Sequence, residues 1–306
     1  MKKSLTTRKA AAVGAAALTL LVSACGGSSK ATDNSSAACP NGTVRFGIEP
    51  YEAPAKLTPA YAVLAKALSK GLGCEVKMTI VADYAAEVLA MKNGKLDLAE
   101  FGPLGFVFAN ENADAQPVAS FADASGKLSS YTAGIWVPKD SAIQTLADLK
   151  GKKLALSSVG STSGDALPRY ALQTAGIKQS DLKIQYAGGH PESLLALTKG
   201  KVDAGEINTQ ELASAVAAGA IKAEDYRRIW ESNPIPNDPI TVRGDLSTAF
   251  KAKVKAVLTG LSPADIAAVG KFLDVEPAGP MIPVQKATYQ QLFDLAAALH
   301  LTEKDA

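Results

Sequence analysis

The hydrophobic pattern of the chain alternates short apolar runs with longer amphipathic segments. Apolar runs bounded by glycine, proline or polar residues are typical of strands, and apolar residues spaced three or four apart are typical of helices. The predicted strands are 43–48, 75–81, 96–101, 132–137, 153–156, 182–186, 203–207, 227–231 and 240–243. The predicted helices are 61–70, 85–92, 167–175, 193–199, 211–218 and 288–299. This alternation predicts an α/β protein with parallel or mixed sheets flanked by helices.

Two proline-containing segments divide this pattern, one at 137–140 and one at 234–239. Prolines fix the backbone and end strands, so both segments are predicted crossings between lobes. The predicted domains are lobe 1 at 43–137, lobe 2 at 138–235, and 236–306 as the return to lobe 1 with C-terminal helices. A chain that leaves one lobe, builds a second and returns creates a cleft for a ligand, which closes by a hinge motion.

The N-terminus predicts a secretory signal peptide at 1–24. Its basic residues are Lys2, Lys3, Arg8 and Lys9. An apolar run at 10–22 follows, too short to span a membrane, and small residues lead to Cys25. A cysteine at the cut resembles the lipobox of bacterial lipoproteins, which implies that Cys25 is lipidated. An ordinary signal peptide with an incidental cysteine is the alternative.

The segment 25–42 is then the lipidated cysteine with a flexible tether, rich in glycine, serine and alanine. The mature protein is expected at the outer face of the cytoplasmic membrane, anchored through Cys25. Removal of the four basic leader residues changes the net charge from +2 to −2. With no basic stripe and only 6 % aromatic residues, nucleic acid is not an expected partner.

Cys39 and Cys74 each precede a predicted strand, 43–48 and 75–81. Neighbouring parallel strands bring their starting ends together, so in an oxidising exterior we predict a disulfide between these cysteines. Two unpaired thiols are the alternative. The chain has only two histidines and no Cys-x-x-Cys spacing, so neither a metal nor a cofactor is expected.

A cluster of hydroxyl residues, Ser161-Thr162-Ser163-Gly164, lies between the predicted strand 153–156 and the helix 167–175. Hydroxyl groups and unpaired backbone N–H groups at a helix N-terminus can bind an anion. The simpler alternative is that Ser161 or Ser163 only caps the helix.

Several motifs, in order, resemble those of the phosphonate/phosphite/phosphate-binding proteins of ABC importers, which have the type II periplasmic binding fold. The motifs are DYAA (83–86), GKLDLAEFGP (94–103), YTAG (131–134), LADLKGK (146–152), STSG (161–164), GH (189–190), GKVDAG (200–205) and WESNPIPNDPI (230–240). The resemblance runs from about Val44 to about Val257. It implies a monomeric binding protein that delivers a small phosphorus oxyanion to a permease and its ATPase.

The resemblance also implies which residues hold the oxyanion. They are Tyr84, Tyr131, Ser161, Thr162, Ser163 and His190. Hydroxyl and amide donors suit a tetrahedral oxyanion because they match its many lone pairs without a full charge. Read alone, Tyr84 is equally consistent with packing on its lobe, Tyr131 with a half-buried strand position, and His190 with a helix start.

The chain departs from the relatives that bind 2-aminoethylphosphonate at one position. The resemblance implies two carboxylates facing the ligand's ammonium group, and of these Asp238 is present while Gln210 occupies the other position. Glu206 and Glu211 are close in sequence but are expected to point elsewhere. A lost charge-assisted hydrogen bond costs roughly 1.5–3 kcal/mol. We therefore predict inorganic phosphate, phosphite or a simple phosphonate as ligand, with 2-aminoethylphosphonate as the alternative.

Two other function classes compete with an importer component. A hydrolase would need a serine activated by His190 with Asp238, but no Gly-x-Ser-x-Gly elbow is present. Metal-dependent phosphatase chemistry would need clustered histidines or aspartates. An enzyme is therefore not expected. A ligand sensor for a membrane receptor has the same sequence features as a transport component and stays open.

Overall fold

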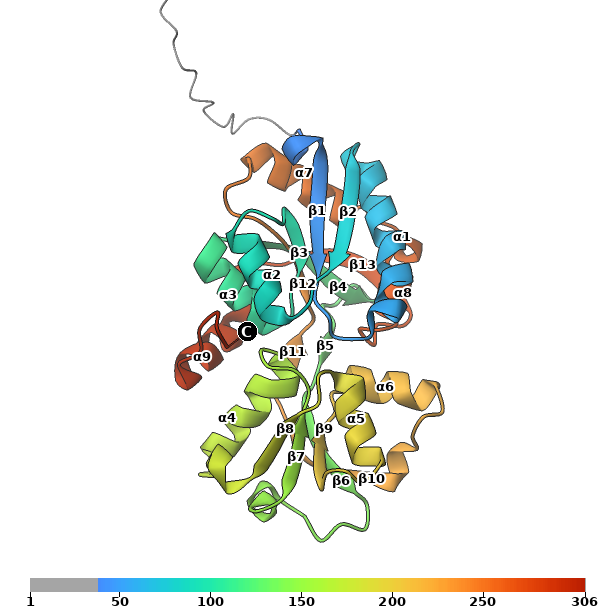
Figure 1. The fold of residues 1–306 in the computed structure, drawn as a ribbon. Coiled ribbons are helices and arrows are strands. Elements are labelled where there is room, and N and C mark those ends of the chain that lie inside the picture. Colours follow the sequence, from blue (N-terminus) through green and yellow to red (C-terminus); the bar gives the residue numbers. More distant parts are fainter. Residues whose placement is uncertain (1–37, 306) are drawn as a thin grey trace, which may run out of the picture. The chain divides into compact units, whose positions relative to one another are not determined.

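The structure, a computed structural model, describes residues 38–305. The expected signal peptide, the lipidation site Cys25 and the tether up to residue 37 lie outside these residues. The described chain forms a six-stranded sheet in the order β13-β4-β12-β3-β1-β2 and a five-stranded sheet in the order β10-β6-β9-β7-β8. A short two-stranded sheet, β11-β5, accompanies them (Figure 1). We call the six-stranded sheet with its helices the first lobe and the five-stranded sheet with its helices the second lobe.

The strands are β1 (Thr43–Ile48), β2 (Glu75–Ile80), β3 (Leu98–Glu100), β4 (Gln116–Asp123), β5 (Ser130–Tyr131), β6 (Gly134–Pro138), β7 (Lys153–Leu156), β8 (Lys183–Tyr186), β9 (Ala204–Glu206), β10 (Tyr226–Glu231), β11 (Ile235–Pro236), β12 (Pro239–Val242) and β13 (Ala278–Pro283). The α-helices are α1 (Pro54–Leu72), α2 (Tyr84–Lys92), α3 (Pro103–Ala113), α4 (Leu167–Thr174), α5 (His190–Thr198), α6 (Thr209–Ala217), α7 (Thr248–Thr259), α8 (Pro263–Gly270) and α9 (Gln290–Leu299). The short helical turns are η1 (Pro40–Gly42), η2 (Leu146–Leu149), η3 (Thr162–Ala166), η4 (Gln179–Asp181), η5 (Ala223–Asp225) and η6 (Lys286–Tyr289).

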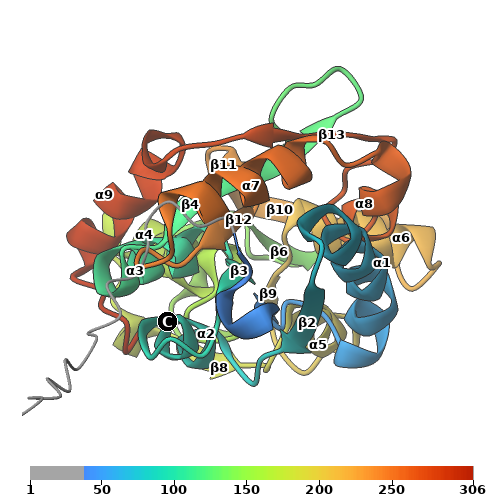
Figure 2. The same cartoon turned by 90° about the horizontal axis from the view of Figure 1, so that it is seen from above.

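In the first lobe, β1 lies between β3 and the edge strand β2 and pairs in parallel with both. The strand β12 is antiparallel to β3 and β4, and β13 is antiparallel to β4, so the sheet is mixed. Alternation along β1 directs Val44, Phe46 and Ile48 into one core with α1, α7 and α8. A second core on the other face packs α2, α3 and α9, and Figure 2 shows both helical layers.

In the second lobe, β7 pairs in parallel with β8 and β9, whereas β6 is antiparallel to β9 and β10. Ile135 and Val137 of β6 pack with Leu172 of α4 on one face of the sheet. Trp136 lies on the other face, in a core with residues of α5 and α6. Both lobes are therefore three-layered α/β units with mixed sheets, as the alternating pattern predicts.

The first expected crossing, at 137–140, is wrong. Strand β6 (Gly134–Pro138) already belongs to the second lobe, where it pairs with β9 and β10. The chain leaves the first lobe earlier, near β5, whose Tyr131 pairs with Ile235 of β11. Pro138 thus ends a strand rather than a lobe. The other expected crossing, at 234–239, contains β11 and the first residue of β12.

The sequence pattern did not predict β4, β13 or α3. Helix α3 has seven buried residues from Pro103 to Ala109, so it lacks the polar face that makes a helix recognisable. Strand β13 contains Pro280 and Pro283, and prolines are unfavourable within a sheet. It is an edge strand of the sheet, where a missing backbone donor is tolerated.

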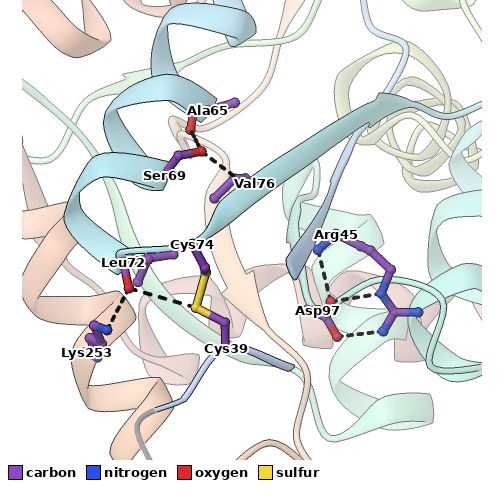
Figure 3. The surroundings of a disulfide bond; sticks show 9 residues. All are labelled: Cys39, Arg45, Ala65, Ser69, Leu72, Cys74, Val76, Asp97 and Lys253. Atoms are coloured by element: carbon purple, nitrogen blue, oxygen red, sulfur yellow. Dashed lines mark hydrogen bonds and ion pairs between the residues drawn. A yellow bond between two sulfur atoms is a disulfide. The ribbon is translucent and has the colours of Figure 1, made fainter. Parts of the chain in front are cut away.

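The predicted disulfide between Cys39 and Cys74 is present and joins the chain before β1 to the start of β2 (Figure 3). Nearby, Leu72 at the end of α1 accepts a hydrogen bond from Lys253 Nζ at 2.6 Å. Arg45 of β1 makes two side-chain hydrogen bonds to Asp97, at 2.9 and 2.6 Å. These contacts secure the starting ends of the parallel strands, whereas the candidate site is built at their carboxyl ends.

Between residues 38 and 305, no helix has the length and apolar character needed to span a membrane. The same part of the chain has no cluster of three or more His, Cys, Asp or Glu side chains arranged to hold a metal ion.

Candidate functional site

The predicted anion-binding turn follows β7 and begins a helix. Ser161 is its N-cap, and Ser161 Oγ accepts the amide of Gly164 at 3.1 Å. The first turn, η3, is π-helical and continues into α4. Its helical hydrogen bonds start at the amides of Asp165 and Ala166, which both donate to Ser161 O. The amides of Thr162 and Ser163 therefore stay outside this ladder, as expected at a helix N-terminus that binds an anion.

Two residues fix the shape of this turn. Asp165 is fully buried, accepts the amide of Gly160 at 3.1 Å and the Tyr186 hydroxyl at 2.7 Å, and forms an ion pair with Arg169 at 2.7 Å. Gly164 is required because a Cβ atom there would lie 1.7 Å from Ser157 Oγ. The hydroxyl residues are thus held by packing and hydrogen bonds rather than presented on a free loop.

The remaining two hydroxyls of the turn are oriented by neighbouring elements. Thr162 Oγ1 accepts the amide of Leu104, in the first turn of α3, at 2.9 Å. Because α3 belongs to the first lobe, this hydrogen bond joins the two lobes. Ser163 Oγ accepts from Asn208 Nδ2 at 3.1 Å, and Asn208 Oδ1 caps α6 by accepting the amide of Glu211. A hydroxyl can donate as well as accept, so both positions can also donate to a ligand oxygen, and Ser163 lies within hydrogen-bonding reach of Tyr131 as well.

His190, the first residue of α5, lies between a serine and a carboxylate. Its Nε2 is 3.2 Å from Ser161 Oγ, and its Nδ1 is 3.0 Å from Glu206 Oε2. Burial opposes a charged imidazole, but the carboxylates of Glu206, Glu211 and Asp238 together outweigh burial and raise the pKa of His190. The acid behind His190 is therefore Glu206, not Asp238 as in the hydrolytic triad considered from sequence. A protonated His190 would donate a charge-assisted hydrogen bond toward the site.

Tyr84 and Tyr131 are both buried beside this turn. Tyr84 begins α2 in the first lobe and Tyr131 ends β5 between the sheets. Burial and the nearby Glu49 raise the pKa of Tyr84, and burial and Asp238 raise the pKa of Tyr131. Both phenols therefore stay protonated and are hydrogen-bond donors at any physiological pH.

All eight predicted ligand residues line one cavity of about 30 Å³. They are Tyr84, Tyr131, Ser161, Thr162, Ser163, His190, Gln210 and Asp238. Gln210 is partly committed to the protein, because its Nε2 donates to Asn237 Oδ1 at 2.7 Å and to Leu273 O at 3.2 Å. One buried water molecule needs roughly 10–15 Å³ of cavity volume. The cavity therefore has room for a compact ligand.

Sequence reasoning missed several residues of the same cavity. They are Glu49, Tyr51, Glu52, Gly102, Asn208, Glu211, Ser214 and Phe272. The expectation that Glu211 points elsewhere is wrong, since it lines the cavity beside Gln210 on the first turn of α6. The remaining acid of that region, Glu206, lies behind His190. Glu49 had a detectable signal, because it directly follows β1 at the carboxyl end of the sheet, where α/β proteins bind ligands.

The first lobe buries further carboxyl groups behind the cavity. Glu87 of α2 is completely buried, and neither of its oxygens has a hydrogen-bond partner among the described residues. Glu100 of β3 is also completely buried and accepts a hydrogen bond from the Tyr61 hydroxyl. Burial is the main reason that the pKa values of Glu49, Glu87 and Glu100 are well above the ordinary value.

These buried acids predict that stability falls as pH rises from 5 to 8. An unfolded chain ionises its glutamates near their ordinary pKa, whereas the folded chain keeps Glu87 and Glu100 protonated to higher pH, so rising pH favours unfolding. Glu87→Met removes two unpartnered polar atoms and should add about 1–3 kcal/mol to the free energy of unfolding at pH 8. Urea denaturation at both pH values measures this, with exposed Glu111→Met as the control. A less stable Glu87→Met protein at pH 8 would contradict the prediction.

Comparison with known proteins places this arrangement in a family. The sequence profile described as "ABC transporter, phosphonate, periplasmic substrate-binding protein" matches residues 46–289. The phosphate-import protein PhnD of Mycolicibacterium smegmatis is 30% identical over 80% of each chain. The phosphonates-binding periplasmic protein of Escherichia coli is 32% identical over 69% of this chain and 64% of its own length.

Solved structures agree on the fold. PhnD1 from Prochlorococcus marinus, in complex with methylphosphonate, has a TM-score of 0.74, with 23% identity over 85% of this chain and 99% of that chain. The periplasmic aliphatic sulphonate-binding protein SsuA of Escherichia coli has a TM-score of 0.58, with 23% identity over 88% of this chain and 90% of that chain. The fold is therefore that of the type II periplasmic binding proteins. On the sequence match across most of its length, the chain belongs to the family of extracytoplasmic substrate-binding proteins of phosphonate ABC importers.

Proposed function

We propose that the protein captures a small phosphorus oxyanion, namely inorganic phosphate, phosphite or a simple phosphonate, and delivers it to a permease coupled to an ATPase. The observation that carries this proposal is the Ser161-Thr162-Ser163 turn at a helix N-terminus, facing a cavity shared with Tyr84 and His190. Hydroxyl, phenol and amide groups supply many donors, and a protonated imidazole adds one charge. Such a shell binds a tetrahedral anion and still releases it.

The proposal includes how the protein acts in the cell. Lipid attachment at Cys25 keeps a monomer at the outer face of the cytoplasmic membrane. The open lobes admit the oxyanion to the hydroxyl turn of the second lobe, and closure adds Tyr84 and the first turn of α3 from the first lobe. The closed form docks on the permease, where ATP hydrolysis drives release. The site is built for capture rather than turnover, since its cavity of about 30 Å³ leaves little space for an attacking water beside the anion.

Calorimetric titration of the purified mature protein tests the ligand class. Phosphate, phosphite and methylphosphonate are the probes, with sulfate as a tetrahedral anion that carries no proton near neutral pH. We expect saturable 1:1 binding of at least one phosphorus oxyanion and weaker binding of sulfate. Failure of all the phosphorus oxyanions to bind would overturn the proposal.

A second candidate ligand, 2-aminoethylphosphonate, is favoured by a specific observation. Glu211 and Glu52 both line the cavity, so carboxyl groups other than Asp238 are within reach of an ammonium group. Burial raises the pKa of Glu211 to about 7. Affinity for the aminophosphonate should then rise with pH through that value, and Glu211→Gln should weaken its binding without weakening methylphosphonate. Tighter binding of the aminophosphonate than of the simple oxyanions would select this candidate.

A further inference from the structure

The composition of the cavity lining is unusual for an anion site. Its residues, all within the described chain, include four with carboxyl groups but no lysine or arginine. One of the four, Glu52, is already paired with Lys56 at 2.7 Å. Glu211 lies on the opposite side, at the start of α6. The other two, Glu49 and Asp238, are each only 4% exposed.

Glu49 and Asp238 both come from the first lobe and both have oxygens available to the cavity. Glu49 Oε2 accepts the amide of Gly102, where a Cβ atom would lie 2.7 Å from that oxygen, so the approach requires glycine. No hydrogen bond from the described residues reaches Glu49 Oε1 or either side-chain oxygen of Asp238. The main chain of Asp238 is fixed separately, since its carbonyl accepts from Ser120 Oγ at 2.9 Å.

The charged groups around this pair are mostly acidic. Behind it lie Glu87 of α2 and Glu100 of β3, which both act on Glu49 electrostatically. Across the cavity lies His190 of α5, whose charge is shared with Glu206. The cavity rim adds the Glu52–Lys56 pair and Glu211. Two like charges in one buried site cannot both ionise without a large cost, and a bound anion adds a further like charge.

We propose that Glu49 and Asp238 together hold a proton when the oxyanion is bound, so that ligand capture takes up a proton from solution. The inference rests on the proposed function, because it concerns the same ligand and cavity. The proton comes from solvent and bridges a carboxyl oxygen and a ligand oxygen as an O–H···O hydrogen bond, and no covalent bond between heavy atoms changes. Burial raises the pKa of Asp238 to about 7, and burial together with the charge of Asp238 raises the pKa of Glu49.

Proton uptake is measured by calorimetry near pH 8.5, with phosphate and phosphite as probes, both of which are mainly dianions at that pH. Tris, triethanolamine and diethanolamine differ in ionisation enthalpy, so the observed heat changes with buffer when protons are exchanged. None of these three buffers is a sulfonate or a phosphate, which are themselves oxyanions and could compete for the site. We expect uptake of about one proton per ligand, and affinity that falls roughly tenfold per pH unit in this range.

Two variants locate the proton. Glu49→Gln and Asp238→Asn should each reduce the uptake and flatten the pH dependence, because each removes one member of the pair and the repulsion that favours protonation of the other. Exposed Glu111→Gln is the control and should match the wild type. Oxyanion binding without proton uptake would overturn this inference while leaving the proposed function intact. Unchanged uptake in both folded variants would assign the proton to His190 and also overturn it. If no oxyanion binds the wild type, the proposed function fails and the inference with it.

Discussion

Replacement of Ser161 and Thr162 together by alanine is expected to abolish oxyanion binding in a protein that still folds. In the proposed complex the two hydroxyls donate to a charged ligand, and each such hydrogen bond contributes roughly 1.5–3 kcal/mol. Loss of both should weaken binding roughly 100- to 10,000-fold. The cost in stability is smaller, since loss of the Ser161 helix cap accounts for about 1 kcal/mol.

Calorimetry gives the affinity, and urea denaturation shows whether the double variant is folded. Thr174→Ala, an exposed hydroxyl at the other end of α4, is the matched control and should bind like the wild type. Near-normal affinity in the folded double variant would show that the turn caps its helix and does no more.

His190→Ala is expected to weaken oxyanion binding about 10- to 150-fold and to destabilise the protein by about 3–5 kcal/mol. The loss of affinity follows from the missing charged donor beside Ser161. The loss of stability follows because Glu206 is completely buried and loses its imidazole partner. Burial already raises the pKa of Glu206, so without His190 this carboxyl must stay charged and unpaired or take up a proton. In the wild type, affinity should be highest below the raised pKa of His190 and should fall as pH rises through it.

Adding Glu206→Gln to His190→Ala separates the two effects. The amide removes the unpaired buried charge, so most of the lost stability should return while the affinity stays low. Urea denaturation at pH 7 and calorimetry with phosphate measure the two quantities independently. A single His190→Ala variant as stable as the double variant would show that Glu206 is not charged in the folded protein.

Elements governed by local pattern were predicted well. The apolar runs of β1 and β7 were assigned with their exact boundaries, and the disulfide between Cys39 and Cys74 followed from the expected pairing of the strands after them. The hydroxyl turn could also be recognised in the sequence, because a helix N-terminus after a buried strand is a local feature. All eight proposed ligand residues indeed share one cavity.

Features that depend on tertiary context were not predictable in this way. The position of Glu49 directly after β1 is a local signal, but its burial in the cavity depends on residues distant in sequence, such as Gly102, whose amide donates to its carboxyl group. The assignment of Gln210 as a ligand residue overlooked that its amide nitrogen is used by Asn237 and Leu273, which are distant in sequence. The misplaced crossing also depends on tertiary context. Only the pairing of β6 with β10 shows that Pro138 lies at the end of a strand of the second lobe.

The hydrogen bonds between lobes affect how affinity is set. Leu104 donates to Thr162, and Gln210 donates to Leu273 O, so the lobes are joined by contacts between protein atoms alone. Such contacts bias the pre-equilibrium between open and closed forms toward the closed one. The apparent dissociation constant is the intrinsic constant divided by the fraction of molecules in the binding-competent form. A larger fraction therefore increases the affinity for every ligand by the same factor. These contacts therefore affect the overall binding affinity at low ligand concentration, but not the selectivity of the cavity among ligands.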